Sequence, residues 1–312
     1  MKYTLQKYNG TKTRFDCPKC NGKKTFTRYI DTETNDYLSD HVGRCNKIEK
    51  CEYHFKPKQF FEDNKDYTQV YKPQQKKIAP PPKPMFTIPI EQLDATLTQY
   101  NSNNFALILV KLFDYADAVK LLTLYEIGTS KKWNGANIFW QIDANGIVRT
   151  GKVMLYNIET NKRVKQPYDH ISWVHKDILK DSHELKQCFF GAHLINQFKT
   201  KTIAIVESEK SAIICSHFFP EYVWLSAGNI NGLTIEKFEV LRGRKVILFP
   251  DLNKGFEMWQ KKANEFKHIT DISISDYLQR IATPEQQANG LDLADYLIET
   301  ITKNVGHVDN VA

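Results

Sequence analysis

The chain has 312 residues, enough for two domains at about 150 residues each. Hydrophobic residues make up 41% and charged residues 25%, a composition that excludes collagen, low-complexity disorder and disulfide-rich miniproteins. Lys and Arg outnumber Asp and Glu by 43 to 36, a mild basic excess that is compatible with a nucleic-acid partner. No apolar run reaches the roughly 20 residues that span a bilayer, and the N-terminus lacks the apolar core of a signal peptide. We therefore expect a cytoplasmic protein without a membrane partner.

The first predicted element is a small head, residues 1–70, which contains four of the six cysteines. These cysteines form two pairs, Cys17 with Cys20 and Cys45 with Cys51. The pairs flank a predicted hairpin, residues 24–31 and 37–43, as in a zinc ribbon. Two such pairs complete the tetrahedral site that Zn²⁺ prefers, and a head of about 60 residues has too small a core to fold well without a metal. We expect a structural zinc ion and favour Cys51 over His54 as its fourth ligand; free core cysteines are the alternative.

Basic and aromatic residues interleave in this head. The basic residues are Lys12, Arg14, Lys19, Lys23, Lys24, Arg28 and Arg44, and the aromatic residues are Phe15, Phe26 and Tyr29. Cations contact phosphates and rings stack on bases, so the pattern is typical of a surface for single-stranded nucleic acid, with Arg14 and Arg44 as candidate contacts. A solvated basic face over core aromatic residues is the alternative.

A proline-rich stretch separates the head from a larger body. Residues 71–84 read YKPQQKKIAPPPKP, with five prolines and four lysines. Prolines favour the extended polyproline II conformation, so we predict a semi-rigid linker.

The first part of the body, residues 85–200, is predicted to contain helices followed by a β-meander. Apolar residues recur at helical spacing through 91–113 and 115–125. An Asn-Gly turn then joins the apolar runs 138–142 and 148–158, which is a strong hairpin signal.

One segment of the meander comes close to a phosphate-binding loop. Residues 146–153 read GIVRTGKV, against the pattern G-x4-G-K-[ST]. Val153 lacks the hydroxyl that would bind magnesium, and the segment lies inside a meander instead of between a buried strand and a helix. We therefore do not expect a nucleoside-triphosphatase site. Four basic residues remain candidate phosphate contacts, with ordinary solvent exposure as the alternative: Arg149, Lys152, Arg163 and Lys165.

The second part of the body, residues 201–312, alternates short apolar strands with helices. The predicted strands cover residues 202–206, 222–226 and 244–250. The predicted helices cover residues 208–219, 234–241, 256–266 and 293–301. This alternation predicts βαβ units and a parallel sheet, so the fold class is α/β in this half and α+β for the whole chain.

Acidic residues gather where the predicted strands end. Glu207 and Asp251 each follow a buried parallel strand, and Asp292 and Asp295 begin the last helix. Ligands of open α/β sheets bind at the carboxyl ends of the strands, and Mg²⁺ prefers carboxylate oxygens together with phosphate and water. We expect a magnesium site here; plain helix capping and solubility are the alternative.

These motifs carry a resemblance to a known fold. Glu207 after the first strand, Gly228 in the loop after the second and Asp251-x-Asn253 after the third resemble a Toprim domain, the catalytic fold of bacterial-type primases, topoisomerases and some nucleases. In bacterial-type DNA primases a zinc ribbon, a connecting region and a Toprim domain follow in this order. Nearly the whole chain is similar to an uncharacterised primase-like family from mobile elements of Bacteroidota. The segments that carry this similarity are GRCNKIEKCEYHF (43–55), RTGKVMLYN (149–157), ISWVHK (171–176), IVESEKSAII (205–214), VILFPDLN (246–253) and GLDLADYLI (290–298).

The resemblance implies roles for single residues. Glu207 corresponds to the Toprim glutamate, a general acid/base or metal partner, and Asp251 to the first aspartate of the Asp-x-Asp motif. Asn253 stands in place of the second aspartate, and its neutral amide is a weaker metal ligand. The acidic residues that could compensate are Glu209, Asp292 and Asp295. The basic residues expected to hold phosphates are Lys210, Arg149 and Lys152.

Two functions follow from this resemblance. The first is a primase-like nucleotidyltransferase that uses Mg²⁺ or Mn²⁺, nucleoside triphosphates and a single-stranded DNA template, with a Toprim nuclease as its variant. The second is a catalytically degenerate protein that binds single-stranded DNA for a mobile element, supported by Asn253. A replicative helicase or a mobilisation protein is the expected protein partner in either case.

Overall fold

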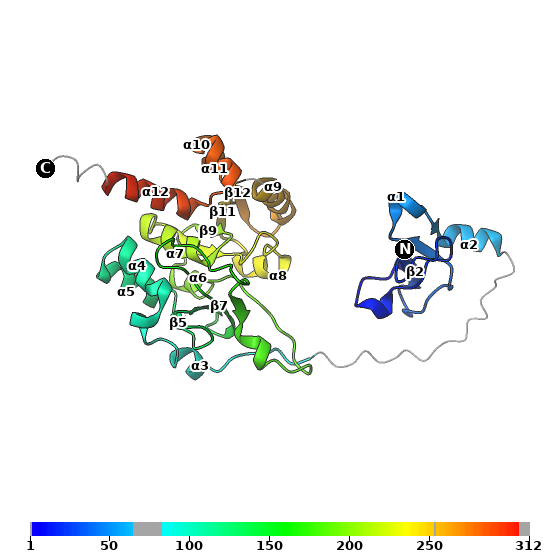
Figure 1. Cartoon of the computed structure of the whole chain (residues 1–312), viewed down its shortest axis with the longest axis horizontal. Helices are drawn as coiled ribbons and strands as arrows, with labels where there is room; N and C mark the ends of the chain where they lie inside the picture. Colours follow the sequence, from blue (N-terminus) through cyan, green and yellow to red (C-terminus); the bar gives the residue numbers. More distant parts are fainter. Residues whose placement is uncertain (1, 65–82, 253, 306–312) are drawn as a thin grey trace. The chain divides into compact units, whose positions relative to one another are not determined.

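The computed structural model describes residues 2–64, 83–252 and 254–305, so Asn253 and most of the predicted linker lie outside the described residues. The chain divides into two compact units, Met1–Pro80 and Pro81–Ala312. Figure 1 shows the elements of each unit in chain order. In the described residues, no helix has both the length and the apolar character needed to cross a bilayer.

The first unit is built on one antiparallel sheet. Its strands are β1 (Tyr3–Leu5), β2 (Phe26–Asp31), β3 (Gly43–Cys45) and β4 (His54–Phe55), paired in that order. Two short helices, α1 (Ile48–Cys51) and α2 (Pro57–Asp63), complete it. The predicted hairpin is present as β2 and β3, but its second arm begins at residue 43, and Tyr37 forms only an isolated bridge to Ile30.

The second unit begins with helices α3 (Ile90–Asp94), α4 (Asn104–Leu112) and α5 (Tyr115–Leu124). The predicted helical stretch 91–113 is therefore interrupted between α3 and α4. Asn103 explains where α4 begins, because its side chain accepts hydrogen bonds from the backbone N–H groups of Phe105 and Ala106. Asp114 caps α5 in the same way through the N–H of Asp117.

An antiparallel sheet follows these helices. Its strands are β5 (Ile127–Thr129), β6 (Asn137–Ile142), β7 (Val148–Met154) and β8 (Ile171–Trp173), paired in chain order. Side chains alternate between the two faces of a strand. Phe139 of β6 accordingly packs into the main core of the unit, while its neighbours Ile138 and Trp140 pack into a second hydrophobic cluster.

A parallel sheet carries the rest of the unit. Its strands are β9 (Ile203–Val206), β10 (Val223–Ser226), β11 (Lys245–Leu248) and β12 (Asp271–Ile274), in the order β10-β9-β11-β12. Its helices are α6 (Leu194–Gln197), α7 (Glu209–Phe218), α8 (Ile235–Phe238), α9 (Lys254–Phe266), α10 (Tyr277–Ile281), α11 (Pro284–Asn289) and α12 (Leu293–Val305). The predicted α/β class with a zinc-ribbon head, an antiparallel region and a Toprim-like parallel sheet is confirmed. Four elements of this half were not predicted: α6, β12, α10 and α11.

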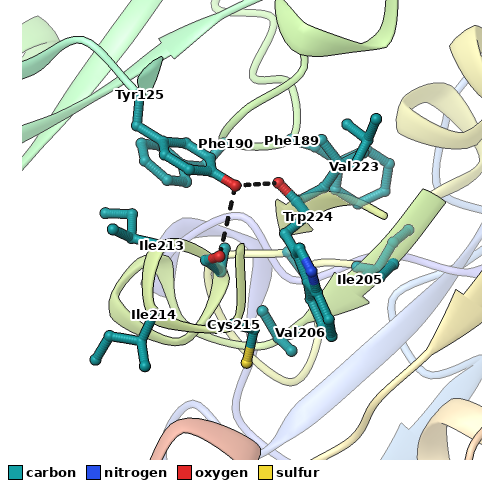
Figure 2. Packing of buried hydrophobic residues seen from close by; sticks show 14 of the residues in the cluster. Tyr125, Phe189, Phe190, Ile205, Val206, Ile213, Ile214, Cys215, Val223 and Trp224 are labelled. Atoms are coloured by element: carbon teal, nitrogen blue, oxygen red, sulfur yellow. Dashed lines mark hydrogen bonds between the residues drawn. The ribbon is translucent and has the colours of Figure 1, made fainter. Parts of the chain in front are cut away.

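A single core joins the two sheets of this unit. Tyr125, directly after α5, stacks on Phe190 with ring centroids 5.2 Å apart. Its hydroxyl donates a hydrogen bond to the carbonyl oxygen of Trp224 in β10 at 3.1 Å (Figure 2). Fully burying one large apolar side chain stabilises a fold by about 1.5–3 kcal/mol. Because α5 and β10 share this core, the regions predicted as 85–200 and 201–312 pack into one compact unit.

Candidate functional site

The four predicted zinc ligands come together in the first unit. The Sγ atoms of Cys17 and Cys51 are 3.7 Å apart, and those of Cys20 and Cys45 are 4.0 Å apart. All four sulfurs lie within 4.8 Å of one another. Four thiolates at this spacing match the donor set and size of a structural zinc site, so the residues present fit the ion.

His54 is not part of this cluster. Its Nε2 atom lies 2.9 Å from the Tyr29 hydroxyl, and its ring stacks on the Tyr29 ring. The structure therefore places Cys51, and not His54, beside the other three cysteines. Burial, together with the neighbouring sulfurs, raises the pKa of the Cys51 thiol to about 12. A bound cation is what would hold this sulfur as a thiolate at neutral pH.

The aromatic residues of the head have different surroundings. Phe26 is fully buried in the small core around the cysteines and does not form a stacking surface. Arg28 lies over the ring of Phe15, 3.8 Å from its centroid. Arg14 lies over the ring of Tyr8 at 5.0 Å, and Tyr8 is 66% exposed. Sequence reasoning missed Tyr8, although it lies close to a basic residue of the same head.

Arg44 occupies an exposed position in the middle of β3. Its strand neighbour is His54 of β4, with which it is directly paired in register. The arginine side chain is thus accessible for the phosphate contact expected of it.

The two predicted Toprim acids meet at the carboxyl edge of the parallel sheet. Glu207 follows β9 and Asp251 follows β11, and these two strands are direct neighbours. The Glu207 carboxylate lies so close to Gly255 that a Cβ atom there would be 2.8 Å from its Oε1 atom. A side chain at position 255, near the start of α9, would therefore displace this carboxylate.

Burial and mutual repulsion shift the protonation of these acids. Burial, with the nearby Asp292 carboxylate, raises the pKa of Glu207 to about 7. Burial, Asp292 and Glu207 together raise the pKa of Asp251 to about 9. Carboxylates crowded at this partly buried edge of the sheet repel one another when they are charged. A divalent cation bound between them would relieve this repulsion.

The start of α12 brings the other two acids to the same edge. The Ser211 hydroxyl donates to Asp292 at 2.5 Å, and Asp292 in turn accepts the backbone N–H of Asp295 at 2.7 Å. Lys210 donates to the Asp295 carboxylate at 2.7 Å. Although burial alone would lower it, the Asp292 and Asp295 carboxylates hold the pKa of Lys210 above its ordinary value.

A cleft of about 440 Å³ connects these acids to a set of basic residues. The sequence-predicted residues that line it are Lys152, Arg163, Lys165, Glu207, Lys210, Asp251, Asp292 and Asp295. Sequence reasoning missed several polar residues of its lining, among them Lys162 and Asn229. Lys162 belongs to the same basic run as Arg163 and Lys165, so its position beside them was the available signal.

Arg149 does not line this cleft. Its guanidinium donates twice to one Asp143 carboxylate oxygen, at 2.8 and 2.6 Å, beside a separate cavity of about 180 Å³. Arg149 stands where the register of β6 and β7 shifts, so it has no direct partner on β6, and its side chain turns to Asp143 and not to the cleft. The segment 146–153 forms a hairpin turn and a strand, as expected, and not a phosphate-binding loop.

The acidic edge differs from the cysteine cluster in its geometry. In the part of the chain that the structure describes, the cysteines are the only group of three or more candidate ligand atoms within 4.8 Å of one another. Glu207, Asp251 and Asp292 therefore do not form a closed cage. An open set of carboxylates suits Mg²⁺, which keeps water and substrate oxygens among its ligands.

The comparisons with known proteins agree with this two-unit organisation. Residues 1–66 match a family described as a zinc beta-ribbon finger. Residues 103–252 match a family described as a domain of unknown function, DUF6371, and this range contains Glu207 and Asp251 but ends before Asp292. No curated protein matches the sequence.

Among solved structures, the chain is similar to several primase fragments at low identity. The primase fragment of the bacteriophage T7 primase-helicase protein is 12% identical, with a TM-score of 0.34, over 87% of this chain and 90% of that one. The Aquifex aeolicus primase, with its zinc-binding and RNA polymerase domains, is 12% identical, with a TM-score of 0.37, over 97% and 85%. The RNA polymerase domain of Mycobacterium tuberculosis primase DnaG is 10% identical, with a TM-score of 0.41, over 64% and 80%.

Proposed function

We propose that this protein is a primase-like nucleotidyltransferase that joins nucleoside triphosphates on a single-stranded DNA template, with Mg²⁺ or Mn²⁺ as its catalytic ion. The observation that carries the proposal is the cleft in which four carboxylates face exposed lysine and arginine side chains. Carboxylates suit a divalent cation, and the basic side chains suit phosphates. The resemblance of the sequence to primase-like Toprim proteins favours this chemistry over other reactions of phosphate esters.

The acidic residues of the cleft would hold the ion and transfer a proton. Glu207 and Asp251 would hold the divalent ion, with Asp292 beside them. When bound, that ion neutralises charge on the phosphates and activates the attacking hydroxyl. Without the ion, a pKa near 7 would also let Glu207 accept or return a proton at neutral pH, as a general base requires.

The basic side of the cleft would bind and orient the substrate. Lys162, Arg163 and Lys165 are exposed at the rim and free to reach phosphate oxygens of a triphosphate or a template strand. Lys210, already ion-paired with Asp295, contributes charge to the cleft and orients that carboxylate. The zinc head would bind the template through Arg14 and Arg44, with exposed Tyr8 as a stacking ring.

The test is a primer-synthesis assay on the full-length protein. It contains single-stranded DNA, ribonucleoside or deoxyribonucleoside triphosphates, and Mg²⁺ or Mn²⁺. We expect short oligonucleotides to form, and Glu207→Ala or Asp251→Asn to reduce their yield by about 100-fold or more, because each removes a carboxylate of the ion site.

Glu221→Gln is the matched control, because Glu221 is an exposed acid outside the cleft lining. This variant should keep wild-type yield. Cleavage of the DNA in place of synthesis would identify a Toprim nuclease. Retention of DNA with neither reaction, under any of the metals, would contradict the enzyme and leave the binding-only function to which Asn253 points.

A further inference from the structure

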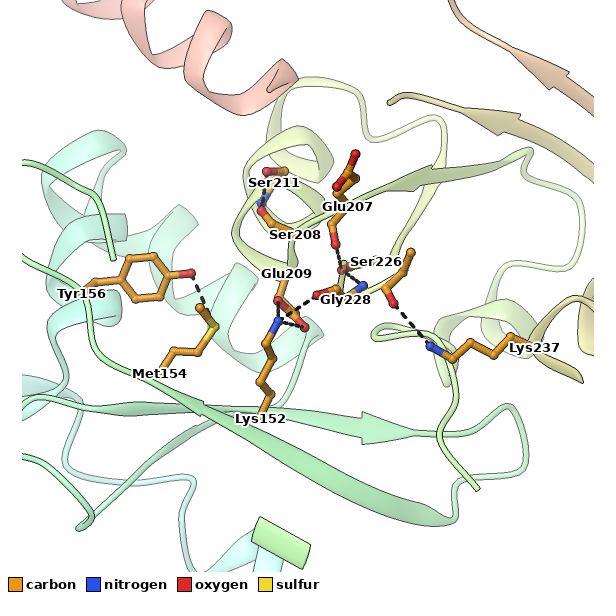
Figure 3. A network of polar contacts seen from close by, with 11 residues as sticks. Lys152, Met154, Tyr156, Glu207, Ser208, Glu209, Ser211, Ser226, Gly228 and Lys237 are labelled. Atoms are coloured by element: carbon orange, nitrogen blue, oxygen red, sulfur yellow. Dashed lines mark hydrogen bonds and ion pairs between the residues drawn. The ribbon is translucent and has the colours of Figure 1, made fainter. Parts of the chain in front are cut away.

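Lys152 and Glu209 form a buried ion pair between the two sheets of the larger unit. Lys152 is on β7 of the antiparallel sheet, and Glu209 is the first residue of α7, directly after the parallel strand β9. The Lys152 Nζ atom lies 3.1 and 3.0 Å from the two carboxylate oxygens of Glu209. Figure 3 shows the Lys152 ammonium beside the Glu209 carboxylate. Only 7% of Lys152 and 1% of Glu209 are exposed, so bulk water screens the pair only weakly.

The ammonium group of Lys152 has a third partner. It donates to the carbonyl oxygen of Gly228 at 3.0 Å. A lysine ammonium has three N–H donors, and here three acceptor oxygens surround it. Lys152 therefore has no donor left for a phosphate, although its side chain lines the cleft.

The Gly228 loop is tied to the candidate catalytic acid. The backbone N–H of Gly228 and the hydroxyl of Ser226 both donate to the carbonyl oxygen of Glu207, each at 2.9 Å. Lys237 holds the same loop from its other side through the carbonyl oxygen of Ala227 at 3.3 Å (Figure 3). A displacement of the loop would consequently displace the backbone of Glu207.

We infer that Lys152 and Glu209 are positioning residues: their ion pair fixes the Glu207 turn and the Gly228 loop against the antiparallel sheet that carries the exposed basic run. The pair binds neither substrate nor metal. The catalytic role of Glu207 rests on the proposed function, whereas the contacts by themselves support the coupling of the two sheets.

The structure explains why residues 146–153 nearly match a phosphate-binding loop. Gly151 is required because a Cβ atom there would lie 2.6 Å from Ile138 and 2.9 Å from Trp140. Lys152 leaves the opposite face of β7 and reaches Glu209. Gly151 thus allows close packing on one face of β7, and Lys152 forms the ion pair on the other face.

A mutational cycle separates a positioning role from a phosphate contact. Lys152→Met leaves the Glu209 carboxylate buried without its cation, and Glu209→Met leaves the ammonium with one acceptor in place of three. Each single variant should lower kcat by about 10-fold or more with little change in the KM for nucleoside triphosphate, because a displaced Glu207 impairs the reaction step. The double variant Lys152→Met/Glu209→Met removes both charges and should recover to within about threefold of wild type.

Lys162→Met is the matched control, because Lys162 is an exposed lysine of the same cleft. This variant should raise KM and leave kcat unchanged. If Lys152 binds phosphate instead, Lys152→Met will raise KM as Lys162→Met does, and the second substitution at Glu209 will not restore activity. That result would overturn the inference.

Hydrogen exchange on the full chain tests the pair without any activity. Lys152→Met should speed amide exchange in peptides that contain Glu207 and Gly228, whereas Lys162→Met should leave both at the wild-type rate. Faster exchange in a protein that makes no primers would reject the proposed function and keep the inference. Unchanged exchange with intact primer synthesis would reject the inference and keep the function. If Lys152→Met does not fold, Glu209→Gln, which keeps an acceptor for Lys152, replaces it in both measurements.

Discussion

Neighbouring residues around the start of α7 have different roles at the acidic edge. Glu207 reaches the cleft, Glu209 turns to Lys152, and Lys210 turns to Asp295. Glu207 precedes the helix, and the side chains of Glu209 and Lys210 leave its first turn about 100° apart, so the three charged residues contact different partners. The expectation that Glu209 supplies an extra metal ligand does not fit this arrangement, because both of its oxygens are bound to Lys152.

The buried histidine His193 should make the stability of the larger unit depend on pH. Burial lowers the pKa of His193, although its hydrogen bond to the carbonyl oxygen of Leu124 partly opposes the shift. A folded pKa below the unfolded value of about 6.5 means that the unfolded chain binds the proton first. The contribution of His193 to stability is therefore intact above pH 6.5 and is lost as pH falls from there toward the folded pKa.

We expect His193→Gln to remove this dependence. The difference in unfolding free energy between wild type and variant should shrink between pH 7 and pH 5, by roughly 1.4 kcal/mol for each unit by which the pKa is lowered. Urea unfolding of the larger unit at several pH values measures it. His268→Gln, at an exposed site, is the control and should leave the wild-type slope unchanged. A constant difference across this range would show that His193 is not held neutral by burial.

At the scale of elements, strand β7 connects the two hydrophobic clusters and the ion pair. Its face with Gly151 packs on Ile138 and Trp140 of β6, and its other face carries Lys152. The same strand therefore contributes to the stability of the sheet and to the position of the acidic edge. A substitution on one face should change stability, and a substitution on the other should change the reaction.

Gly151→Ala tests the packed face of this strand. The added methyl group would overlap Ile138 and Trp140, so we expect a loss of about 1–3 kcal/mol in the free energy of unfolding. Thermal or urea unfolding of the larger unit measures the loss. Gly146→Asn is the control, because Gly146 has a φ of 81° with open space around its Cβ position, and asparagine tolerates that conformation. Equal stability of the two variants would contradict the packing argument.

At the scale of the whole molecule, the two compact units are stabilised in different ways. The larger unit has a continuous core with residues from helices and both sheets, whereas the buried core of the first unit is mainly Phe26 and three cysteines. We expect a unit with so few buried apolar side chains to draw folding free energy from a bound metal.

We expect about one zinc ion per chain by elemental analysis. Cys51→Ala or a chelator should remove it and abolish the thermal transition of the first unit, because three ligands no longer close the tetrahedral site. The transition of the larger unit should remain within about 2 °C of its original value. His54→Gln and Cys188→Ala, which change no cysteine of the cluster, should both keep the zinc. A first unit that stays folded and metal-free would contradict the site.

The sequence by itself determined the features that depend on local spacing. Cys17 and Cys20, with two residues between them, are spaced to share one metal site, and the apolar runs of β9, β10 and β11 identify the parallel strands. Glu207 and Asp251 could be placed at one edge because each directly follows a parallel strand, and chain connectivity then dictates the edge. The short edge strand β12, DISI, was missed because its apolar run is too brief to predict a strand.

Only the tertiary structure decided which distant residues meet. Lys152 and Glu209 are 57 residues apart, and no local pattern indicates that the lysine is bound within the protein and not available to phosphate. The separation of Arg149 from the cleft follows from the register shift at its position and from its ion pair with Asp143, which depend on strand pairing and not on composition. Spacing and hydropathy are properties of one segment, whereas an ion pair or a cleft belongs to several segments brought together by the core.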